Sequence, residues 1–168
     1  SYTAFQGEAE IARVDFFRSI NGWPIVGPTY NEGLIKMIVG IPEKTQLMKR
    51  TPYIYYNVRG IVEQTDATYP LIPVALAWEE VIKGNGVISY VKPLNKSPFD
   101  TYTPVRIEEI LITDIFLGYY DDTLEQPYLQ PIYVFEGSYL TQNDEKGSIA
   151  LYYPAISGEY IKQPSSTE

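Results

Sequence analysis

The chain has 168 residues and a net charge of −8, and it contains neither histidine nor cysteine. The missing histidine excludes a Ser-His-Asp triad and any imidazole ligand for zinc, copper or haem. The missing cysteine excludes a thiolate nucleophile, a disulfide and a thiolate-held iron–sulfur cluster. Because affinity for nucleic acid comes mostly from Lys and Arg that neutralise phosphates, an acidic chain of this kind is a poor nucleic-acid binder.

The composition is that of a folded protein rich in β structure. Hydrophobic residues make up 45% of the chain, and there are 16 Tyr, 13 Pro and 12 Gly. Tyr favours half-buried pleated surfaces, whereas Pro and Gly favour turns. No apolar run approaches the roughly 20 residues that span a bilayer. Because the chain begins at Ser1 rather than Met, we expect a trimmed or processed form from which a targeting segment is missing.

The first elements in chain order are predicted to be strands joined by a tight turn. Apolar and polar residues alternate from Ala12 to Phe16, and Asn21-Gly22 precedes a second apolar run, Trp23–Val26. Asn-Gly between two apolar runs is the strongest short signal for a β-hairpin, because both residues tolerate positive φ. A helix over Glu8–Arg18 is the alternative that remains open.

Two more strands are predicted in the first half, over Leu34–Val39 and Tyr53–Val62. In the second of these, the period-two alternation predicts that Ile54 and Tyr56 point inward and that Tyr55 points outward. The first half therefore consists of strands with little helix.

One helix is predicted, and it follows a turn-rich stretch, Thr65–Pro73, that suits a boundary between subdomains. The helix runs over Val74–Lys83, where apolar residues recur at helical spacing. Pro73 suits its start, and Lys83-Gly84 suits its end, where a cation and a left-handed glycine are both favourable. The apolar residues at this spacing are Val74, Ala77, Trp78, Val81 and Ile82.

Four strands in succession are predicted after the helix. They are Val87–Val91, Ile110–Tyr120, Tyr128–Glu136 and Ser148–Tyr153, with a polar turn at Asn143–Gly147 before the last. The second is apolar on both faces apart from Asp114, which is typical of a central strand. In the third, Pro131 predicts a bulge or an edge position.

This order of elements predicts an α+β fold that is mostly antiparallel β-sheet with one helix. We expect two small subdomains. Residues 1–68 form a β-rich N-terminal subdomain, and residues 69–168 form a helix packed on a four-stranded antiparallel sheet.

No motif in the sequence gives a strong chemical signal. Adjacent carboxylates occur at Glu79-Glu80, Glu108-Glu109 and Asp121-Asp122, and glycoside hydrolysis needs two carboxyls roughly 5–10 Å apart. Exposed faces and turns explain these pairs better. Asn143–Glu145 lacks the full spacing of a calcium loop and is better explained as a hairpin turn. We therefore predict no catalytic, cofactor-binding or metal-binding residue.

The order of motifs in the second half is more informative. A helix with Ala77-Trp78 ends at Lys83–Gly86, Ile112–Tyr120 and Tyr128–Gly137 follow, and a closing strand ends in Tyr153–Ile156. Over roughly residues 69–157, this order resembles the C-terminal half of membrane-anchored ectodomains of bacteria, the Yyc-type regulators of an essential cell-wall sensor kinase. These in turn resemble PepSY domains. Residues around Val14–Arg18 are similar, more faintly, to the preceding subdomain of the same proteins.

The resemblance implies an extracytoplasmic, non-enzymatic protein held by an N-terminal membrane helix outside this sequence. It implies that the protein binds or restrains a partner protein of the cell envelope, such as a sensor kinase, and it brings no catalytic residue and no cofactor. A strand edge and an acidic, Tyr-bearing loop are the expected contact surfaces, because an edge strand adds to a partner's sheet without special side chains. The predicted partner-binding residues are Tyr55, Tyr119, Tyr120, Asp121, Asp122, Tyr128 and Pro131.

Other functions remain open. A secreted module that binds cell-wall glycan or peptide would use exposed Tyr and Trp23, and would present two or more Tyr rings on a flat face. A self-assembling envelope subunit would need unlike apolar patches on opposite faces. PepSY domains are also linked to protease inhibition. A carboxylate-pair hydrolase would need two acidic side chains at one deep pocket, one of them with a raised pKa.

Overall fold

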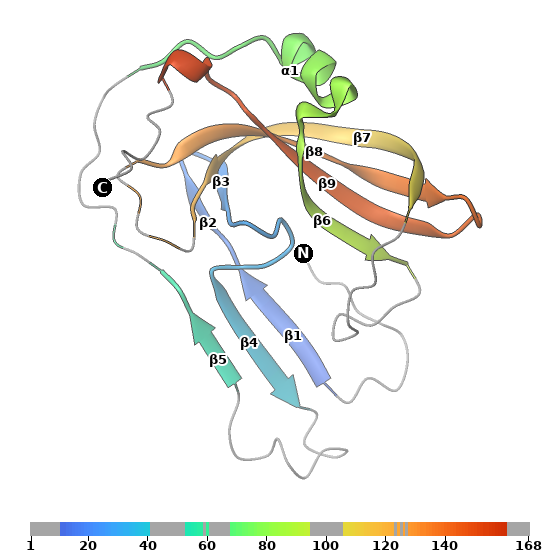
Figure 1. Cartoon of the computed structure of the whole chain (residues 1–168). Helices are drawn as coiled ribbons and strands as arrows, with labels where there is room; N and C mark the ends of the chain where they lie inside the picture. The colour runs from blue at the N-terminus through green and yellow to red at the C-terminus, as the bar shows by residue number, and fades with distance from the viewer. Residues whose placement is uncertain are drawn as a thin grey trace, which may run out of the picture.

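The described part of the chain consists of two β-sheets and one short helix (Figure 1). The computed structural model describes residues 11–40, 53–58, 60, 68–94, 106–122, 124, 126 and 128–160. The strands are β1 (Ile11–Phe16), β2 (Arg18–Ile20), β3 (Trp23–Val26), β4 (Ile35–Gly40), β5 (Tyr53–Tyr56), β6 (Val87–Pro93), β7 (Ile107–Tyr120), β8 (Gln130–Thr141) and β9 (Lys146–Pro154). Helix α1 (Val74–Glu80) continues into a π-helical turn over Val81–Asn85, and a 3-10 turn lies at Gly158–Tyr160.

The strands form a three-stranded sheet in the order β1-β4-β5 and a six-stranded sheet in the order β2-β3-β7-β8-β9-β6. All of these pairings are antiparallel except that of β3 with β7. Figure 1 shows α1 on one side of the larger sheet and the three-stranded sheet on the other. The predicted α+β class, mostly antiparallel sheet with one helix, is confirmed.

The predicted hairpin at Asn21-Gly22 is confirmed. Ile20 pairs with Trp23, so the loop has two residues, and Asn21 and Gly22 have φ values of 51° and 84°. Positive φ at both positions gives the turn whose twist matches that of the flanking strands. The alternative helix over Glu8–Arg18 is wrong where the structure describes it, because β1 pairs along its whole length with β4.

Strand β5 corrects the predicted orientation of the third apolar run. Ile54 and Tyr56 were expected to point inward, but they are 57% and 67% exposed. The reason is that no side chain of β5 belongs to a buried cluster of the described residues, and all four residues of this edge strand are exposed. Period-two alternation separates two faces of a strand, but it does not say whether either face is covered.

Helix α1 lies close to the predicted range, and Gly84 with a φ of 89° helps to end the π-helical turn that follows it. Ala77 is fully buried, and the Trp78 ring stacks on Phe135 with 5.7 Å between ring centroids. Val74 and Ile82 share the helical spacing of these residues, but their side chains are 44% and 65% exposed. The helix therefore buries only some of the apolar side chains that lie at helical spacing.

The two faces of the six-stranded sheet carry different clusters of buried side chains. On the α1 face, Ala77 packs against buried residues of β8 and β9, which are Phe135, Tyr139, Ile149 and Leu151. On the opposite face, the buried residues are Val26, Ile132, Val134 and Tyr152, with Tyr30, Phe116 and Tyr120 packed against them. Residues of β8 alternate between the two clusters, as the pleat of a strand requires. The connection Gly27–Leu34 thus lies on the face opposite α1.

Strand β8 corrects the prediction for Pro131. Pro131 pairs with Tyr119 in regular register near the start of β8, which lies between β7 and β9, so it marks neither an edge nor a bulge. Its carbonyl accepts a hydrogen bond from the Ala155 N–H at 2.9 Å. Since the nitrogen and carbonyl of one strand residue point to the same side, the missing N–H faces the end of β9 and costs no bond to β7.

Strand β7 is central only at one end. It pairs with β8 along its length, with register shifts between Ile107 and Glu109 and between Ile112 and Asp114. On its other side, the described residues pair it with β3 only at Tyr119 and Tyr120. The prediction of a central strand therefore holds for the last residues of β7.

The parallel contact between β3 and β7 joins the first and second halves of the chain. Strands β2 and β3 precede residue 68, and β6 to β9 follow it, yet all six lie in one sheet. Residues 61–67, which include part of the predicted boundary Thr65–Pro73, lie outside the described residues. The division at residue 68 stays a prediction.

Candidate functional site

An apolar groove lies between α1 and β7. Its lining residues are Val74, Ala75, Trp78, Ile112 and Ile115, and its volume is about 290 Å³. The first three are on α1 and the last two are on β7, so the groove lies on the α1 face of the large sheet. We refer to these five residues as the α1–β7 groove.

The groove exists because α1 is too short to cover the large sheet. A helix of seven residues is about 10 Å long, whereas neighbouring strands lie roughly 5 Å apart in the hydrogen-bonding direction. Ala77 and Trp78 cover β8 and β9, and β7 is left beside the helix. Ile115 is consequently 39% exposed although it belongs to an apolar strand.

Carboxylates lie on both elements that form the groove. Glu79 is exposed on α1 directly after Trp78, and Glu108 and Glu109 are exposed on β7. Glu80 is paired instead with Lys83, whose Nζ lies 2.6 Å from its Oε1. The hydrogen bond from Lys83, together with one from Asn85, lowers the pKa of the Glu80 carboxyl. The exposed carboxylates of Glu79, Glu108 and Glu109 thus lie on the same two elements as the groove.

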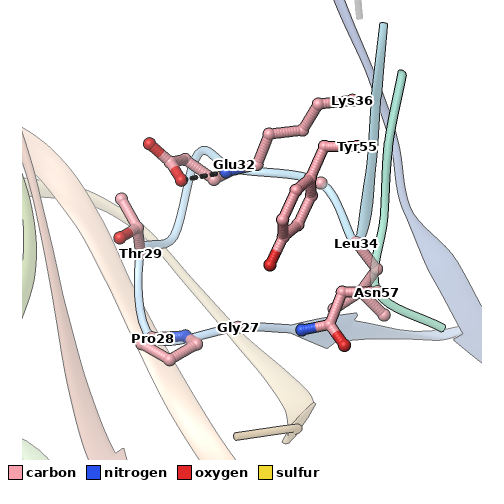
Figure 2. A pocket seen from close by; sticks show the side chains of 9 residues that line it. Gly27, Pro28, Thr29, Glu32, Leu34, Lys36, Tyr55 and Asn57 are labelled. Carbon is pink, nitrogen blue, oxygen red and sulfur yellow. Dashed lines mark hydrogen bonds and ion pairs between the residues drawn. The ribbon is translucent and has the colours of Figure 1, made fainter. Parts of the chain in front are cut away.

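A second pocket, with both polar and apolar residues in its walls, lies on the side of the protein opposite α1. Its volume is about 180 Å³. The lining residues come from the connection after β3, from β4, and from β5 and the residue that follows it. They are Gly27, Pro28, Thr29, Glu32, Gly33, Leu34, Lys36, Tyr55 and Asn57. We call it the loop pocket. Figure 2 shows the Tyr55 hydroxyl pointing into the space that the loop encloses.

A chain of charged groups supports the loop pocket. Asp15 Oδ2 accepts from Arg13 Nε at 2.7 Å, Arg13 Nη1 lies 4.0 Å from Glu32 Oε1, and Glu32 also pairs with Lys36. The other oxygen of Asp15 accepts the Gly33 N–H at 2.9 Å. A Cβ at Gly33 would lie 2.6 Å from the Phe16 carbonyl oxygen, so only glycine fits this approach of loop to strand. These contacts hold the loop in one conformation.

The structure separates the predicted partner-binding residues into two places. Tyr55 lines the loop pocket, with Lys36 Nζ 5.2 Å from the centroid of its ring. The remaining residues lie at or beyond the ends of β7 and β8 where these strands meet, and they are Tyr119, Tyr120, Asp121, Asp122, Tyr128 and Pro131.

Part of this second set is packed into the fold. Tyr120 contacts the Tyr152 ring edge-on at 6.2 Å, and burial, aided by the charges of Asp122 and Asp121, raises the pKa of Tyr120. Asp121 is buried, and its N–H donates to the Val26 carbonyl at 2.9 Å. Tyr128 is largely exposed.

Apart from Tyr55, the residues that line the two cavities were not predicted as site residues. Trp78 was predicted on the apolar side of the helix, Ile112 and Ile115 in a central strand, and Asn57 on the outward face of its strand, whereas Glu32 and Lys36 had no predicted role. The i, i+4 spacing of Glu32 and Lys36 was a weak signal, because they lie outside a helix. Each cavity combines segments far apart in the sequence, so no local pattern marks it.

Comparison of the chain with protein-family models, curated proteins and solved structures found no match. Within the described ranges, His, Cys, Asp and Glu form no group that could hold a metal ion. The same residues include no helix with the length and apolar character needed to span a membrane.

Proposed function

We propose that this protein is a non-enzymatic, extracytoplasmic domain that binds a partner protein of the bacterial envelope, such as a sensor kinase, through the α1–β7 groove. The observation that carries the proposal is the exposure of Ile115 and Val74 beside Trp78 in one apolar groove. Apolar grooves of this kind are typical docking sites for apolar segments of partner proteins. A membrane anchor before Ser1 and PepSY-like subdomains belong to the same proposal.

The occupant is an apolar segment with Lys or Arg on its flanks. The chain has a net charge of −8, and exposed carboxylates at Glu79, Glu108 and Glu109 lie on the two elements that form the groove. A second copy of this acidic protein would bring like charges together, which is unfavourable. A basic partner is attracted instead, and the attraction weakens as salt is added.

Site-specific photo-crosslinking tests the proposal. A photoreactive amino acid replaces Ile115 in the groove or, as the matched control, the exposed Ile54 on the edge strand β5. Both variants are exposed to light in the native envelope, and the products are identified by mass spectrometry. We expect one envelope protein to be captured from position 115 and not from position 54.

The binding of the captured protein to the purified chain is then measured, to test whether it depends on the groove. Ile115→Lys introduces a cation beside Trp78, so we expect it to weaken binding of a basic segment by at least tenfold, equivalent to about 1.4 kcal/mol. Ile54→Lys should leave binding unchanged. Equal capture from both positions, or binding that Ile115→Lys does not weaken, would refute the groove as the docking site. Capture of copies of the same chain would indicate instead that the protein is an assembly subunit. Capture of a protease would indicate that it is a protease inhibitor.

A further inference from the structure

We propose that the loop pocket binds one pyranose unit of a neutral glycan. This site is independent of the proposed protein-binding groove, because Tyr30 of the same loop packs on the sheet face opposite α1. The proposal rests on the size of the pocket, on its hydrogen-bonding groups and on the balance of charge around it.

Size limits the ligand to about one ring. The pocket volume of about 180 Å³ is below the range of roughly 300–1,000 Å³ that is usual for drug-sized ligands. Its partly open form admits a ring that remains attached to a longer chain. A single sugar unit of a glycan satisfies both conditions.

The walls offer both donors and acceptors at close quarters. Figure 2 shows the Tyr55 hydroxyl directed into the enclosed space, the Asn57 amide at the edge beside Gly27, and the Glu32 carboxylate paired with Lys36 at another edge. A hydroxyl donates and accepts, an amide does both through different atoms, and a carboxylate accepts. Adjacent hydroxyls of a sugar ring match such a mixed set better than a purely anionic or cationic group does.

The balance of charge favours a neutral ligand. Asp15, Arg13, Glu32 and Lys36 form a chain of two carboxylates and two cations. A charged ligand would compete with the contact between Glu32 and Lys36, whereas a sugar hydroxyl can donate to the carboxylate and accept from the ammonium without separating them. Tyr55 adds a partly exposed aromatic ring against which the apolar C–H groups of a pyranose can pack.

The pocket is also preorganised, which reduces the entropy lost on binding. Asp15 holds the Gly33 N–H, and the Asn57 N–H donates to the Leu34 carbonyl at 2.9 Å. At one end of the loop, the Tyr152 hydroxyl donates to the Gly27 carbonyl at 3.0 Å. The ligand therefore meets walls that are already in place.

Titration followed by NMR tests the proposal. The isotope-labelled full chain is titrated with N-acetylglucosamine, with its β-1,4-linked trimer, with glucuronic acid as a charged sugar, and with glycerol as a small polyol. We expect saturable shifts of the amide signals of Gly27–Leu34 and Tyr55–Asn57 with both neutral sugars. Weaker shifts with glucuronic acid and none with glycerol are expected. Tighter binding of the trimer than of the monomer would identify a glycan rather than a free sugar as the ligand.

A matched pair of variants links the shifts to the pocket. Tyr55→Phe removes the hydroxyl that points into the pocket, and we expect it to weaken binding about fivefold. Tyr56→Phe makes the same change at the next residue of the edge strand and should leave affinity unchanged. Amide spectra of both variants check that the fold is intact. The proposal is overturned if neither neutral sugar gives saturable shifts at the pocket, or if Tyr55→Phe and Tyr56→Phe bind equally. Ile115→Lys should not affect the titration, so it separates this site from the groove.

Discussion

Two tyrosine hydroxyls hold the connection Gly27–Leu34 against the large sheet. Tyr30 donates to Glu136 Oε2 at 3.0 Å, and its ring lies 6.1 Å from that of Phe116. Tyr152 donates to the Gly27 carbonyl from the sheet side. Burial is the largest cause of the raised pKa of both hydroxyls, and the hydrogen bond to Glu136 raises that of Tyr30 further. The folded protein therefore favours both tyrosines in their neutral form.

The raised pKa values of Tyr30 and Tyr152 predict a loss of stability at alkaline pH. Between the ordinary tyrosine pKa of about 10 and the raised values, the unfolded chain loses protons that the folded protein retains. The free energy of unfolding should therefore be constant with respect to these groups below about pH 10 and fall above it. Urea unfolding at several pH values measures the slope.

The control for this prediction is Tyr56→Phe, which changes an exposed tyrosine on the edge strand β5. Tyr30→Phe should reduce the alkaline slope and cost about 1 kcal/mol at neutral pH through the lost hydrogen bond. Tyr56→Phe should leave the alkaline slope of the free energy of unfolding unchanged. If Tyr30→Phe also left it unchanged, the Tyr30 hydroxyl would not hold the loop in the way that the structure shows.

The hairpin turn gives a second prediction at the residue scale. Gly22 has a φ of 84°, and no atom lies within 4 Å of a Cβ built there, so only backbone strain opposes a side chain. Gly22→Ala should lower the free energy of unfolding by about 1 kcal/mol. Gly60 has equally open surroundings without positive φ, and Gly60→Ala should change stability by less than about 0.5 kcal/mol. Equal effects in chemical denaturation would contradict this account.

At the scale of elements, α1 both completes the core and leaves the groove open. Its buried contact is Ala77, which meets Phe135 and Leu151 among other residues. Ala75 lies two positions earlier, which places it on the other side of the helix, where it lines the groove. One short helix thus presents a core face and a binding face.

Matched substitutions distinguish these two faces. Ala77→Leu adds three carbon atoms at a fully buried position. The resulting overpacking should lower the free energy of unfolding by about 1–3 kcal/mol. Ala75→Leu adds the same atoms in the open groove, where we expect little loss of stability and weaker binding of the partner segment. Thermal unfolding and the binding assay measure the two effects. Similar destabilisation by both variants would place Ala75 in the core instead.

For the whole molecule, the decisive contact is the parallel pairing of β3 with β7. Ile25 pairs with Tyr119 and Val26 with Tyr120, and both aliphatic side chains are almost fully buried. Val26 also belongs to the same cluster as Val134. The N-terminal hairpin therefore supplies part of the core of the second half of the chain.

A fragment of residues 69–168 tests the predicted division at residue 68. Without β2 and β3, the cluster formed by Val26, Ile132, Val134 and Tyr152 loses part of its cover. We expect the fragment to unfold at lower urea concentration than the full chain and to associate through the exposed apolar surface. A fragment that is as stable and monomeric as the full chain would establish residues 69–168 as an independent domain.

Local signals in the sequence were sufficient for much of the fold. Asn21-Gly22 predicted the first hairpin, and apolar spacing ending at Gly84 predicted the helix. The polar run Asn143–Gly147 predicted the last turn, where the Thr141 hydroxyl accepts the Glu145 N–H at 3.2 Å. These features depend on residues a few positions apart, so their conformational preferences can be identified without knowing the rest of the structure.

Other features were decided only by the tertiary structure, because they depend on residues far apart in the sequence. Ile54 and Tyr56 are exposed because neither buried cluster of the described residues extends to β5, and Pro131 fits into β8 because the chain at the end of β9 pairs with its carbonyl. The loop pocket brings Glu32 together with Asn57, and the α1–β7 groove joins Trp78 to Ile115. The composition, with neither histidine nor cysteine, restricted the chemistry that the protein can perform. The choice of strand partners determined which apolar and polar side chains remain available for binding. This choice is not local, because pairing is set by the whole sheet.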